Sequence, residues 1–494
     1  MTQLAESPTT TTSAPDGHRV VGLRRDLVVQ EDDDRPGLIH LRGARGSGTV
    51  GPLTQGVCRA VRALAGGPLP EEVLSRLATE AEDESAVLPL QMLLRRMDAA
   101  GLLEHSVCVG DAVVATLVVA GRGGVGPLAA PARHRPVKLS RFAVVRPVDG
   151  RLRVEAPRSP QLVELLGAGT SVLAPLADWM SPDDPDVTSS LPARAFRETL
   201  ALLATAGLLT AGGDEHDPET RSAQWAPWSA TDLWLHARSQ GPELREGYGG
   251  TYPLRERFAP WPAVAPDRGL ERVVLDPPAP VDPAGEPSLA AVMEQRRSVR
   301  EHDDARPITR DELGTLLHRC LRTVGVYESG DHEVCSRPHP GGGALYELEV
   351  YPVVTSCRGL DPGVWHYDPV EHALEYVAAA SDSSDTLVRT ARTAALMERP
   401  PQVLLVVTAR FGRVMWKYEG MAYALVLKHV GVVYQTLYLV ATAMGLAPCA
   451  LGGGDAAAFA AASGIEYGLE GSVGAFLVGS RPADQSVRFA PPER

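Results

Sequence analysis

The run PQVLLVVTARF (401–411) is followed by MWKY (415–418) and then by MAYALVLKHVGVVYQTLYLVATAMGLA (421–447). The first run is short, apolar and rich in β-branched residues, which is typical of a buried strand. The last run is long enough for a buried helix of many turns. A buried strand that leads into a buried helix indicates a layered domain of sheet and helices, with MWKY in the connection.

Lys417 and Tyr418 stand side by side at the edge of this apolar sequence. One interpretation is a solvated helix start, from which the lysine side chain reaches water. The other is a proton-handling pair at a buried site, because a lysine becomes a base when burial lowers its pKa. The pair alone does not decide between these two interpretations.

Strands and helices also alternate in the sequence around this core. Thr309 and Glu312 have the spacing of a capping box at the start of a helix. The alternation predicts an α+β or α/β layered domain that begins near Leu289. Its expected elements are helices at 288–297, 309–321, 388–397 and 420–444, strands at 348–356, 401–410 and 470–480, and a hairpin at 363–377.

Two N-terminal segments resemble each other in pattern. In each, a helix that ends at glycine is followed by a second helical stretch and by a helix that ends in AGLL, at Gly101 and at Gly207. A glycine directly after a helix takes the left-handed conformation that ends it. With β-like runs beside these helices, the pattern suggests two winged-helix-like units, at 18–125 and 135–212.

Composition gives the remaining boundaries. Residues 1–17 are rich in Thr and Ser and lack the apolar core of a signal peptide, so we expect a disordered leader. Residues 213–287 contain Gly-rich and Pro-rich stretches, which predicts a linker with one short helix and a Pro-rich arm. The last domain then covers residues 288–494.

The chain is acidic, with a net charge of −13. This balance argues against broad binding of nucleic acid or of anionic membranes, which requires positive potential. The last helix of each winged-helix-like unit carries few cations, which favours peptide binding or scaffolding over DNA binding. The six cysteines form no C-x-x-C pair and no zinc-binding pattern, and we expect no metal site.

One segment, Val430–Leu451, is long and apolar enough to span a membrane. It contains Gly445 and Pro448 and runs into a Gly-rich stretch, so we expect a buried or dimer-interface helix instead. Together with the charge, this predicts a cytoplasmic protein that binds neither membranes nor nucleic acid.

Three motifs suggest ligand contacts. In EQRRSVR (294–300), Arg296 and Arg300 share one face if the helix continues, and two guanidinium groups suit a phosphate. The alternative is a solvated basic helix end. The glycines of RPHPGGGALYELEVY (337–351) and GLAPCALGGGD (445–455) let backbone approach a planar ligand, or form ordinary turns.

The order of these motifs, from Glu294 to Arg481, resembles the nitroreductase-type FMN enzymes. Among them, it is similar to the azoline dehydrogenases of the streptolysin S, microcin B17 and cyanobactin type. The resemblance implies an α+β chain whose C-terminal domain has three layers, α/β/α. The two N-terminal units resemble the peptide-binding winged-helix modules of enzymes that modify ribosomal peptides.

The resemblance also implies site residues. Lys417 and Tyr418 match a pair regarded as catalytic in the subgroup. Gly341 stands where a serine is usual, so one hydroxyl contact to the flavin is lost. The residues implied to hold FMN are Arg296, Arg297, Ser298 and Arg300, then Pro340, Gly341, Gly342 and Gly343, then Gly452 and Gly453, and finally Arg481.

These residue types suit one reaction. Turning a thiazoline or oxazoline ring into an azole removes two hydrogens, one as a hydride to the flavin and one as a proton to a base. Lys417 or Tyr418 can take the proton, and adjacent residues reach one site only in a loop or at a helix start. The apolar neighbours expected to bury them are Met415, Trp416, Met421 and Tyr423.

We therefore expect an FMN-dependent dehydrogenase that acts on the azoline rings of a ribosomally made precursor peptide. The resemblance implies a homodimer with FMN at the subunit interface, and a cyclodehydratase as a partner. Two alternatives remain: an NAD(P)H-dependent nitro or quinone reductase, and a non-catalytic scaffold that binds the leader peptide.

Overall fold

The computed structural model describes residues 16–43, 46–119, 125, 128, 135–184, 189–241, 247–280 and 285–485. The expected leader therefore lies almost wholly outside the described residues. The chain divides into two compact units, residues 1–246 and 247–494. The second unit begins well before position 288, because segments of the expected linker pair with it: Gly249 bridges Glu419, and β12 (Arg272–Val274) joins its sheet. The expected linker is thus divided between the two units.

The second unit is built on a seven-stranded sheet in the order β12-β17-β16-β15-β18-β20-β19. Every neighbouring pair is antiparallel. The predicted strands and the predicted hairpin are confirmed as members of this sheet. Besides β12, its strands are β15 (Leu348–Val354), β16 (Gly363–Asp368), β17 (Ala373–Ala378), β18 (Val403–Arg410), β19 (Leu446–Leu451) and β20 (Glu470–Ser480).

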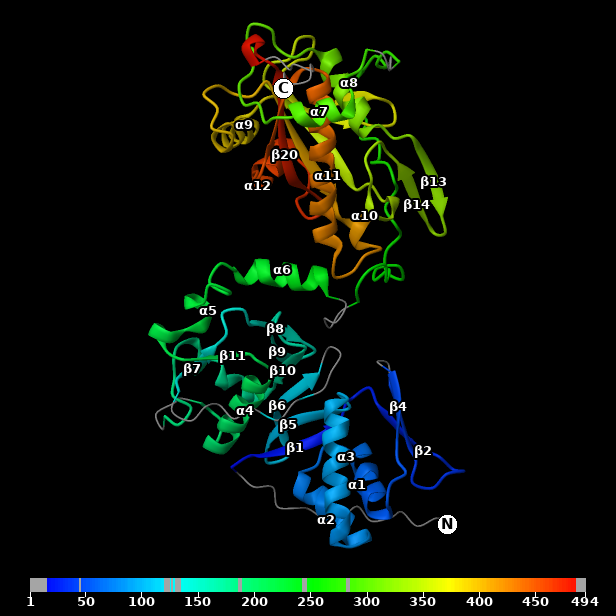
Figure 1. Ribbon diagram of the computed structural model, residues 1–494, viewed down its shortest axis with the longest axis vertical. Coiled ribbons are helices and arrows are strands. Elements are labelled where there is room, and N and C mark those ends of the chain that lie inside the picture. The colour runs from blue at the N-terminus through cyan, green and yellow to red at the C-terminus, as the bar shows by residue number, and fades with distance from the viewer. Residues whose placement is uncertain are drawn as a thin grey trace, which may run out of the picture. The chain divides into compact units, whose positions relative to one another are not determined.

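Helices cover both faces of this sheet, as Figure 1 shows. One apolar core lies between the sheet and helices α8 and α11, and a second lies between the sheet and helices α9 and α12. The capping box of Thr309 and Glu312 is present at the start of α8. The helices of this unit are α7 (Leu289–Gln295), α8 (Arg310–Leu321), α9 (Asp382–Ala394), α10 (Phe411–Met415), α11 (Ala422–Ala443) and α12 (Ala456–Ser463).

The two runs that open the sequence analysis become β18 and α11. All eight residues of β18 are buried, because helices cover it on both faces. Helix α11 buries one face against the sheet, with Val426, Val433 and Leu437 fully buried. By length and composition α11 is able to cross a membrane, but a single apolar helix that lines a core is weak support for a span.

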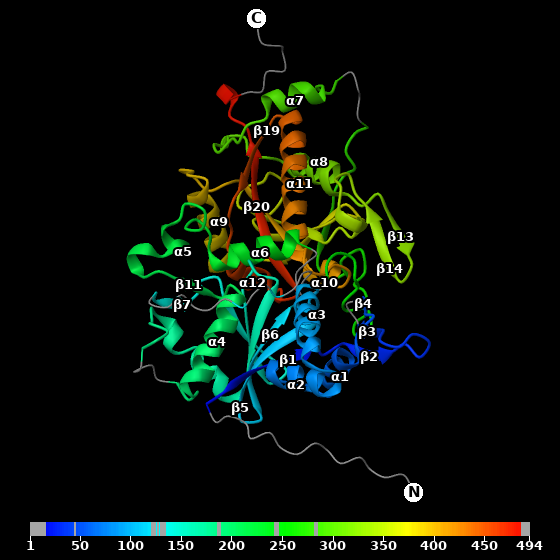
Figure 2. The same ribbon diagram turned by 60° about the horizontal axis from the view of Figure 1, so that its bottom comes forward.

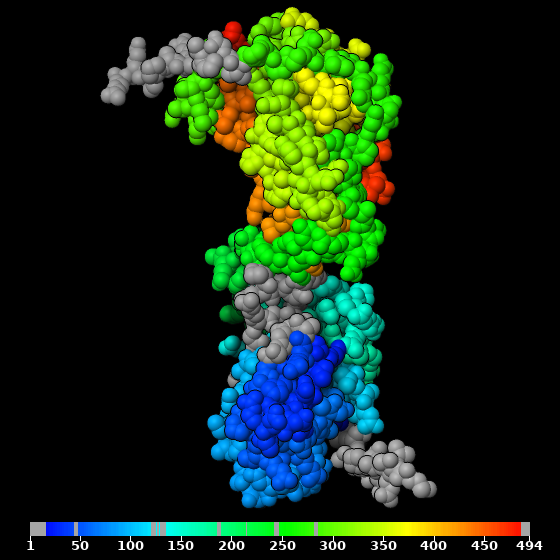
Figure 3. Space-filling model, turned by 90° about the vertical axis from the view of Figure 1, so that its right-hand side faces the viewer, coloured from blue at the N-terminus to red at the C-terminus, as the bar shows by residue number. Residues whose placement is uncertain are grey.

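A hairpin of β13 (Gly325–Ser329) and β14 (His332–Ser336) lies outside the main sheet. Neither strand was predicted from the sequence. In Figure 3, the yellow-green part of the chain, which includes this hairpin, forms much of the visible surface of the second unit. The hairpin connects α8 to the Gly-rich loop that precedes β15.

The first unit contains a six-stranded sheet in the order β1-β5-β6-β10-β9-β8 (Figure 2). Its strands are β1 (His18–Leu23), β5 (Leu103–Val109), β6 (Ala112–Val119), β8 (Val144–Val148), β9 (Arg151–Glu155) and β10 (Gln161–Leu165). Two small sheets pair β2 (Val28–Glu31), β3 (Ile39–Gly43) and β4 (Gly46–Val50), and β7 (Val137–Leu139) with β11 (Leu209–Ala211).

The two expected winged-helix-like units are not confirmed as separate bodies. Strand β6 of the first segment pairs with β10 of the second, so one sheet runs through both. The helix content also differs, since the first segment has three α-helices where the second has short 3-10 turns and α4. The helices are α1 (Gln55–Ala65), α2 (Glu71–Ala81), α3 (Val87–Ala99), α4 (Ala193–Thr205), α5 (Pro218–Arg221) and α6 (Ala230–Gln240).

The shared helix ends of the two segments are confirmed. Gly101 and Gly207 follow α3 and α4 with φ of 67° and 62°. The residue after each glycine donates its N–H to a carbonyl five residues back, from Leu102 to Met97 and from Leu208 to Leu203. This is the Schellman pattern, which explains why glycine stands at both positions.

A buried histidine gives the second unit a pH-dependent stability. His366 on β16 contacts Glu375 (2.9 Å) and Glu349 (3.3 Å). Burial opposes its charge, but the two carboxylates raise the pKa of His366 to about 9. Because the folded pKa exceeds that of the unfolded chain, this stabilisation is complete below pH ~6.5 and is lost as the pH rises through ~9.

We therefore expect the free energy of unfolding of the second unit to fall by about 3 kcal/mol between these pH values, through this group. Urea denaturation at several pH values measures it. The matched variant His366→Gln should lack this part of the slope. Parallel pH profiles for the wild type and the variant would contradict a charged His366.

Candidate active site

Lys417 and Tyr418 lie in the loop between α10 and α11, as the sequence predicted. Their N–H groups donate to the Val414 carbonyl, at 3.2 and 2.8 Å. The Lys417 carbonyl accepts from the N–H of Tyr252 (3.0 Å), and Glu419 bridges Gly249. The loop is thus fixed on one side by α10 and on the other by the segment that enters the second unit.

The Gly-rich loop reaches these two side chains. A Cβ atom placed on Gly343 would lie 2.4 Å from Tyr418 Oη and 3.3 Å from Lys417 Nζ. Gly343 also has φ of 64°, which favours glycine. The structure therefore brings together Gly343, Lys417 and Tyr418, which the sequence predicted for one site.

A buried pair that sequence reasoning missed holds this loop. The N–H of Gly342 donates to His429 Nε2 (2.7 Å), and His429 Nδ1 contacts Glu347 Oε1 (2.7 Å). Because Nε2 accepts, the ring proton is on Nδ1 and donates to the carboxylate. We call His429 and Glu347 the loop clamp. A lone histidine within the apolar run of α11 was the signal for it.

The surroundings of Lys417 are more aromatic and more polar than expected. Its Nζ lies 3.4 Å from His332 Nε2 and 5.8 Å from the centre of the Tyr252 ring. Of the expected neighbours, Trp416 is buried, while Tyr423 is 40% exposed. Burial, with Tyr252 beside it, raises the pKa of Tyr418, so its hydroxyl stays protonated and donates.

The arginine motif at 294–300 contacts another part of α11, near Tyr438. Helix α7 ends at Gln295, so Arg296 and Arg300 do not share a helix face, and that conditional expectation is wrong. Instead, the Arg296 guanidinium lies 5.2 Å from the centre of the Tyr438 ring, and Ser298 Oγ contacts Tyr438 Oη (2.7 Å). After the helix ends, the N–H of Val299 donates to the Pro448 carbonyl on β19.

The remaining predicted flavin contacts gather around β19. Arg481 is buried and donates to the Leu446 carbonyl (2.9 Å), and burial lowers its pKa. One of its terminal nitrogens has no hydrogen-bond partner among the described residues. Gly452 and Gly453 are exposed, and a side chain on either would meet nothing within 4 Å.

The predicted site thus forms two groups. The first, which we call the proton-transfer group after its predicted role, holds Gly343, Lys417 and Tyr418 near His429. The second, the cation group, holds the motif at 296–300 near Tyr438. Nine residues separate His429 from Tyr438, about 14 Å along a helix.

The residues of these groups suit FMN. Among the described residues, no carboxylate lies within salt-bridge distance of Arg296, Arg297 or Arg300, so three cations remain for a phosphate. Gly341, Gly342 and Gly343 carry no side chain, and a Cβ atom on any of them would meet a neighbouring side chain, so backbone lies close beside Lys417 and Tyr418, where a planar ring can approach it. The chemistry of both groups therefore fits a flavin mononucleotide.

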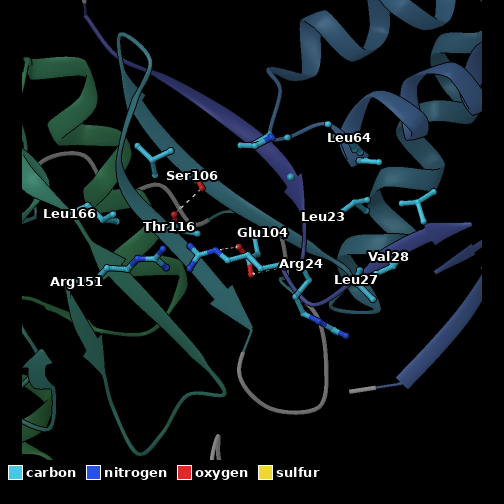
Figure 4. A pocket seen from close by; sticks show the side chains of 18 residues that line it. Leu23, Arg24, Leu27, Val28, Leu64, Glu104, Ser106, Thr116, Arg151 and Leu166 are labelled. Atoms are coloured by element: carbon cyan, nitrogen blue, oxygen red, sulfur yellow. Dashed lines mark hydrogen bonds and ion pairs between the residues drawn. The ribbon is translucent and has the colours of Figure 1, made fainter. Parts of the chain in front are cut away.

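A cavity of about 680 Å³ lies in the first unit (Figure 4). It opens onto the sheet face that carries Glu104, Ser106 and Thr116, and Figure 4 shows the two hydroxyls directed at each other (2.9 Å). Leu23 and Leu64 add apolar surface. Arg24, Arg25 and Arg151 also line the cavity, so its walls are mixed polar and apolar.

A comparison with protein families finds a match within the second unit. Residues 293–480 match a model of the nitroreductase family. A putative nitroreductase of Methanocaldococcus jannaschii is 28% identical over 164 residues, which cover 33% of this chain and 78% of that protein. The similarity to the nitroreductase family therefore covers most of the second unit.

Two further relatives are named for the processing of microcin B17 and of trifolitoxin. The microcin B17-processing protein McbC of Escherichia coli is 34% identical over 133 residues, which cover 25% of this chain and 46% of McbC. The trifolitoxin-processing protein TfxB of Rhizobium leguminosarum bv. trifolii is 30% identical over 127 residues, 25% of this chain and 34% of TfxB. The chain thus spans less than half of either relative.

A solved structure matches over a similar part of the chain. It is the E. coli microcin synthetase McbBCD complex with truncated pro-MccB17 bound. The match has a TM-score of 0.33 and 25% identity, and it covers 38% of this chain and 70% of that one.

Proposed function

We propose that this protein is an FMN-dependent dehydrogenase that oxidises thiazoline or oxazoline rings of a ribosomally made peptide to thiazoles or oxazoles. The observation that carries the proposal is the meeting of Gly343, Lys417 and Tyr418 in a domain whose relatives process peptides. A bound FMN supplies the acceptor for the hydride. The steps below concern the protein's own residues.

Lys417 is proposed as the base. It is half-buried, its Nζ faces the loop at Gly343, and no carboxylate lies within salt-bridge distance among the described residues. A ring that lies over the Gly-rich loop presents a C–H to this amine, which takes the proton as that bond breaks. Tyr418, whose hydroxyl stays protonated, donates a hydrogen bond that orients the ring.

The proposed site for the FMN phosphate consists of Arg296, Ser298 and Arg300, with Arg481 in support. Arg296→Ala should lower the affinity for FMN by about tenfold or more, because a charge-assisted hydrogen bond contributes about 1.5–3 kcal/mol. Titration of the apoprotein with FMN, followed by flavin fluorescence, measures this. Arg389→Ala, at an exposed arginine on α9, is the control and should bind FMN as the wild type does. Equal affinity of both variants would remove Arg296 from the site.

We further propose a homodimer. One exposed stripe runs along α11, formed by residues spaced four apart: Tyr423, Leu427, Gly431 and Gln435. Tyr423 and Leu427 give this stripe its exposed apolar surface, and such surface marks an association site. A dimer around α11 would let the proton-transfer group of one protomer and the cation group of its partner contact one flavin, which explains why the two groups are apart within a protomer.

The peptide substrate is proposed from the two peptide-processing relatives and from the first unit. That unit adds more than 200 residues and a cavity to the domain, and a reductase of small molecules needs neither. A cyclodehydratase that forms the azoline rings is the proposed partner, since these rings are the substrate.

The decisive experiment uses the purified full chain with FMN and a cyclodehydrated precursor peptide. We expect the peptide to lose two hydrogen atoms per ring by mass spectrometry. Rapid reduction of the flavin by NAD(P)H with an unchanged peptide would instead establish the reductase alternative. A protein that takes up no FMN would establish the scaffold alternative.

A further inference from the structure

His332 lies directly behind Lys417 and no predicted role uses it. It is the first residue of β14, and its side chain is only 3% exposed. The ring packs against both Tyr252 and Trp416, at centroid distances of 6.0 and 5.6 Å, and these two rings also contact each other at 5.5 Å. Its Nε2 lies 3.4 Å from Lys417 Nζ.

The other nitrogen of His332 points away from Lys417. Its Nδ1 lies 3.4 Å from Oδ1 of Asp331 at the tip of the β13–β14 hairpin. The Asp331 side chain is 44% exposed and forms an ion pair with Arg255 (2.7 Å). His332 and then Asp331 therefore lead from Lys417 to water.

The surroundings of His332 keep it neutral, so one of its ring nitrogens has a lone pair that can accept a hydrogen bond. Burial lowers its pKa, and Lys417 and Arg413 lower it too, while Asp331 acts in the opposite direction. His332 is therefore neutral near pH 7. With its proton on Nδ1 toward the Asp331 carboxylate, the lone pair of Nε2 faces Lys417.

In the proposed reaction, Lys417 must release a proton after each turnover. In each turnover it gains one proton from the substrate, and an ammonium group cannot act as the base again until that proton leaves. Among the described residues, His332 is the side chain that hydrogen-bonds Lys417 Nζ. Tyr418 cannot take the proton, because its hydroxyl is already protonated.

We propose that His332 and Asp331 form a proton exit from Lys417 to solvent. This rests on the function proposed above. The Lys417 ammonium gives its proton to His332 Nε2, and the imidazolium releases its Nδ1 proton to the Asp331 carboxylate, which passes it to water. The amine of Lys417 is restored and the imidazole is left neutral with its proton on Nε2; a flip of the ring then returns this proton to the side of Asp331, so no further reactant is consumed. His332 is thus a relay residue that acts through Lys417.

A proton relay and a structural histidine predict different kinetics. With FMN bound and a cyclodehydrated peptide as substrate, His332→Gln should leave the first turnover close to the wild-type rate. Repeated turnover in dilute buffer should fall by about tenfold or more, as expected for a lost proton-transfer group. Added imidazole should restore it, because a small base can remove the proton from Lys417 directly. Asp331→Asn keeps the histidine and should show a weaker loss with the same rescue.

A second measurement needs neither flavin nor substrate. Acylation of Lys417 by acetic anhydride, followed by peptide mass spectrometry across pH, reports the fraction of free amine. Because Lys417 and His332 interact, the charging of His332 should add a step to the wild-type acylation profile that His332→Gln lacks. His216→Gln, at an exposed histidine of the first unit, should keep it.

The outcomes separate the two proposals. If the wild type oxidises the peptide but His332→Gln turns over normally in dilute buffer and keeps the two-step profile, the proton exit is wrong. A His332→Gln that loses the first turnover equally, with no rescue by imidazole, would also overturn it. If the wild type oxidises no peptide, the proposed function is wrong and the proton exit is wrong with it.

Discussion

Replacing Lys417 by alanine should abolish ring oxidation while the protein keeps its fold and its flavin. A positioned acid or base contributes about 10²–10⁴-fold to the rate, so we expect a loss in that range. The flavin should stay, because Lys417 lies with the proton-transfer group and not with the cation group near Tyr438. Mass spectrometry of the peptide and the flavin absorbance of the same sample measure the two effects together.

Two further variants make this prediction specific. Lys417→Met keeps most of the side-chain length and should lose as much as alanine, which excludes a lost packing contact. Added methylamine should partly restore Lys417→Ala, because a small amine can occupy the space that the side chain leaves.

Tyr418→Phe decides which of the two residues takes the proton. Because burial keeps the tyrosine hydroxyl protonated, we expect only the loss of one hydrogen bond, about tenfold or less in rate. A loss in Tyr418→Phe larger than that in Lys417→Ala would assign the base to Tyr418. Wild-type turnover by Lys417→Ala would remove Lys417 from the mechanism.

The parts of the fold that the sequence predicted are those with a local cause. The apolar runs of β18 and α11 are long, and the capping residue Thr309 and the glycine Gly207 act on their own helix ends. Local patterns of this kind need no knowledge of the rest of the chain.

The parts that it missed depend on distant partners. Strand β19 contains Pro448, which a central strand rejects, but β19 lies at the edge of the sheet, where proline is tolerated. Pairing of β6 with β10 joins two segments that looked independent. Beyond the end of α7 at Gln295, the N–H of Val299 donates to the carbonyl of Pro448, more than a hundred residues away.

The candidate site shows the same division. Lys417, Tyr418 and Gly343 were predicted by their motifs, and their meeting was implied by the family resemblance. The loop clamp and His332 carry no motif, since each is a single polar residue whose role depends on what folds beside it. Buried polar residues in apolar surroundings were the signal that reasoning from sequence left unused.

Removal of His429 from the loop clamp should have the largest effect on stability. His429→Leu leaves the Gly342 N–H and the Glu347 carboxylate without their partner, and Glu347 is fully buried. Breaking a buried ionic or hydrogen-bonded pair from one side costs about 3–5 kcal/mol, because the remaining charge is uncompensated. Urea denaturation should show this loss, and the freed Gly-rich loop should also bind FMN less tightly.

The double variant His429→Leu/Glu347→Met tests the cause. It removes the buried carboxylate together with its partner, so it should recover a large part of the stability lost by His429→Leu alone. FMN affinity should not recover, because Gly342 still lacks the acceptor that fixes the loop. The two measurements therefore separate the clamp's contribution to the fold from its contribution to the site. If stability and FMN affinity recover together in the double variant, His429 acts on flavin binding only through the stability of the domain, and the clamp does not position the loop.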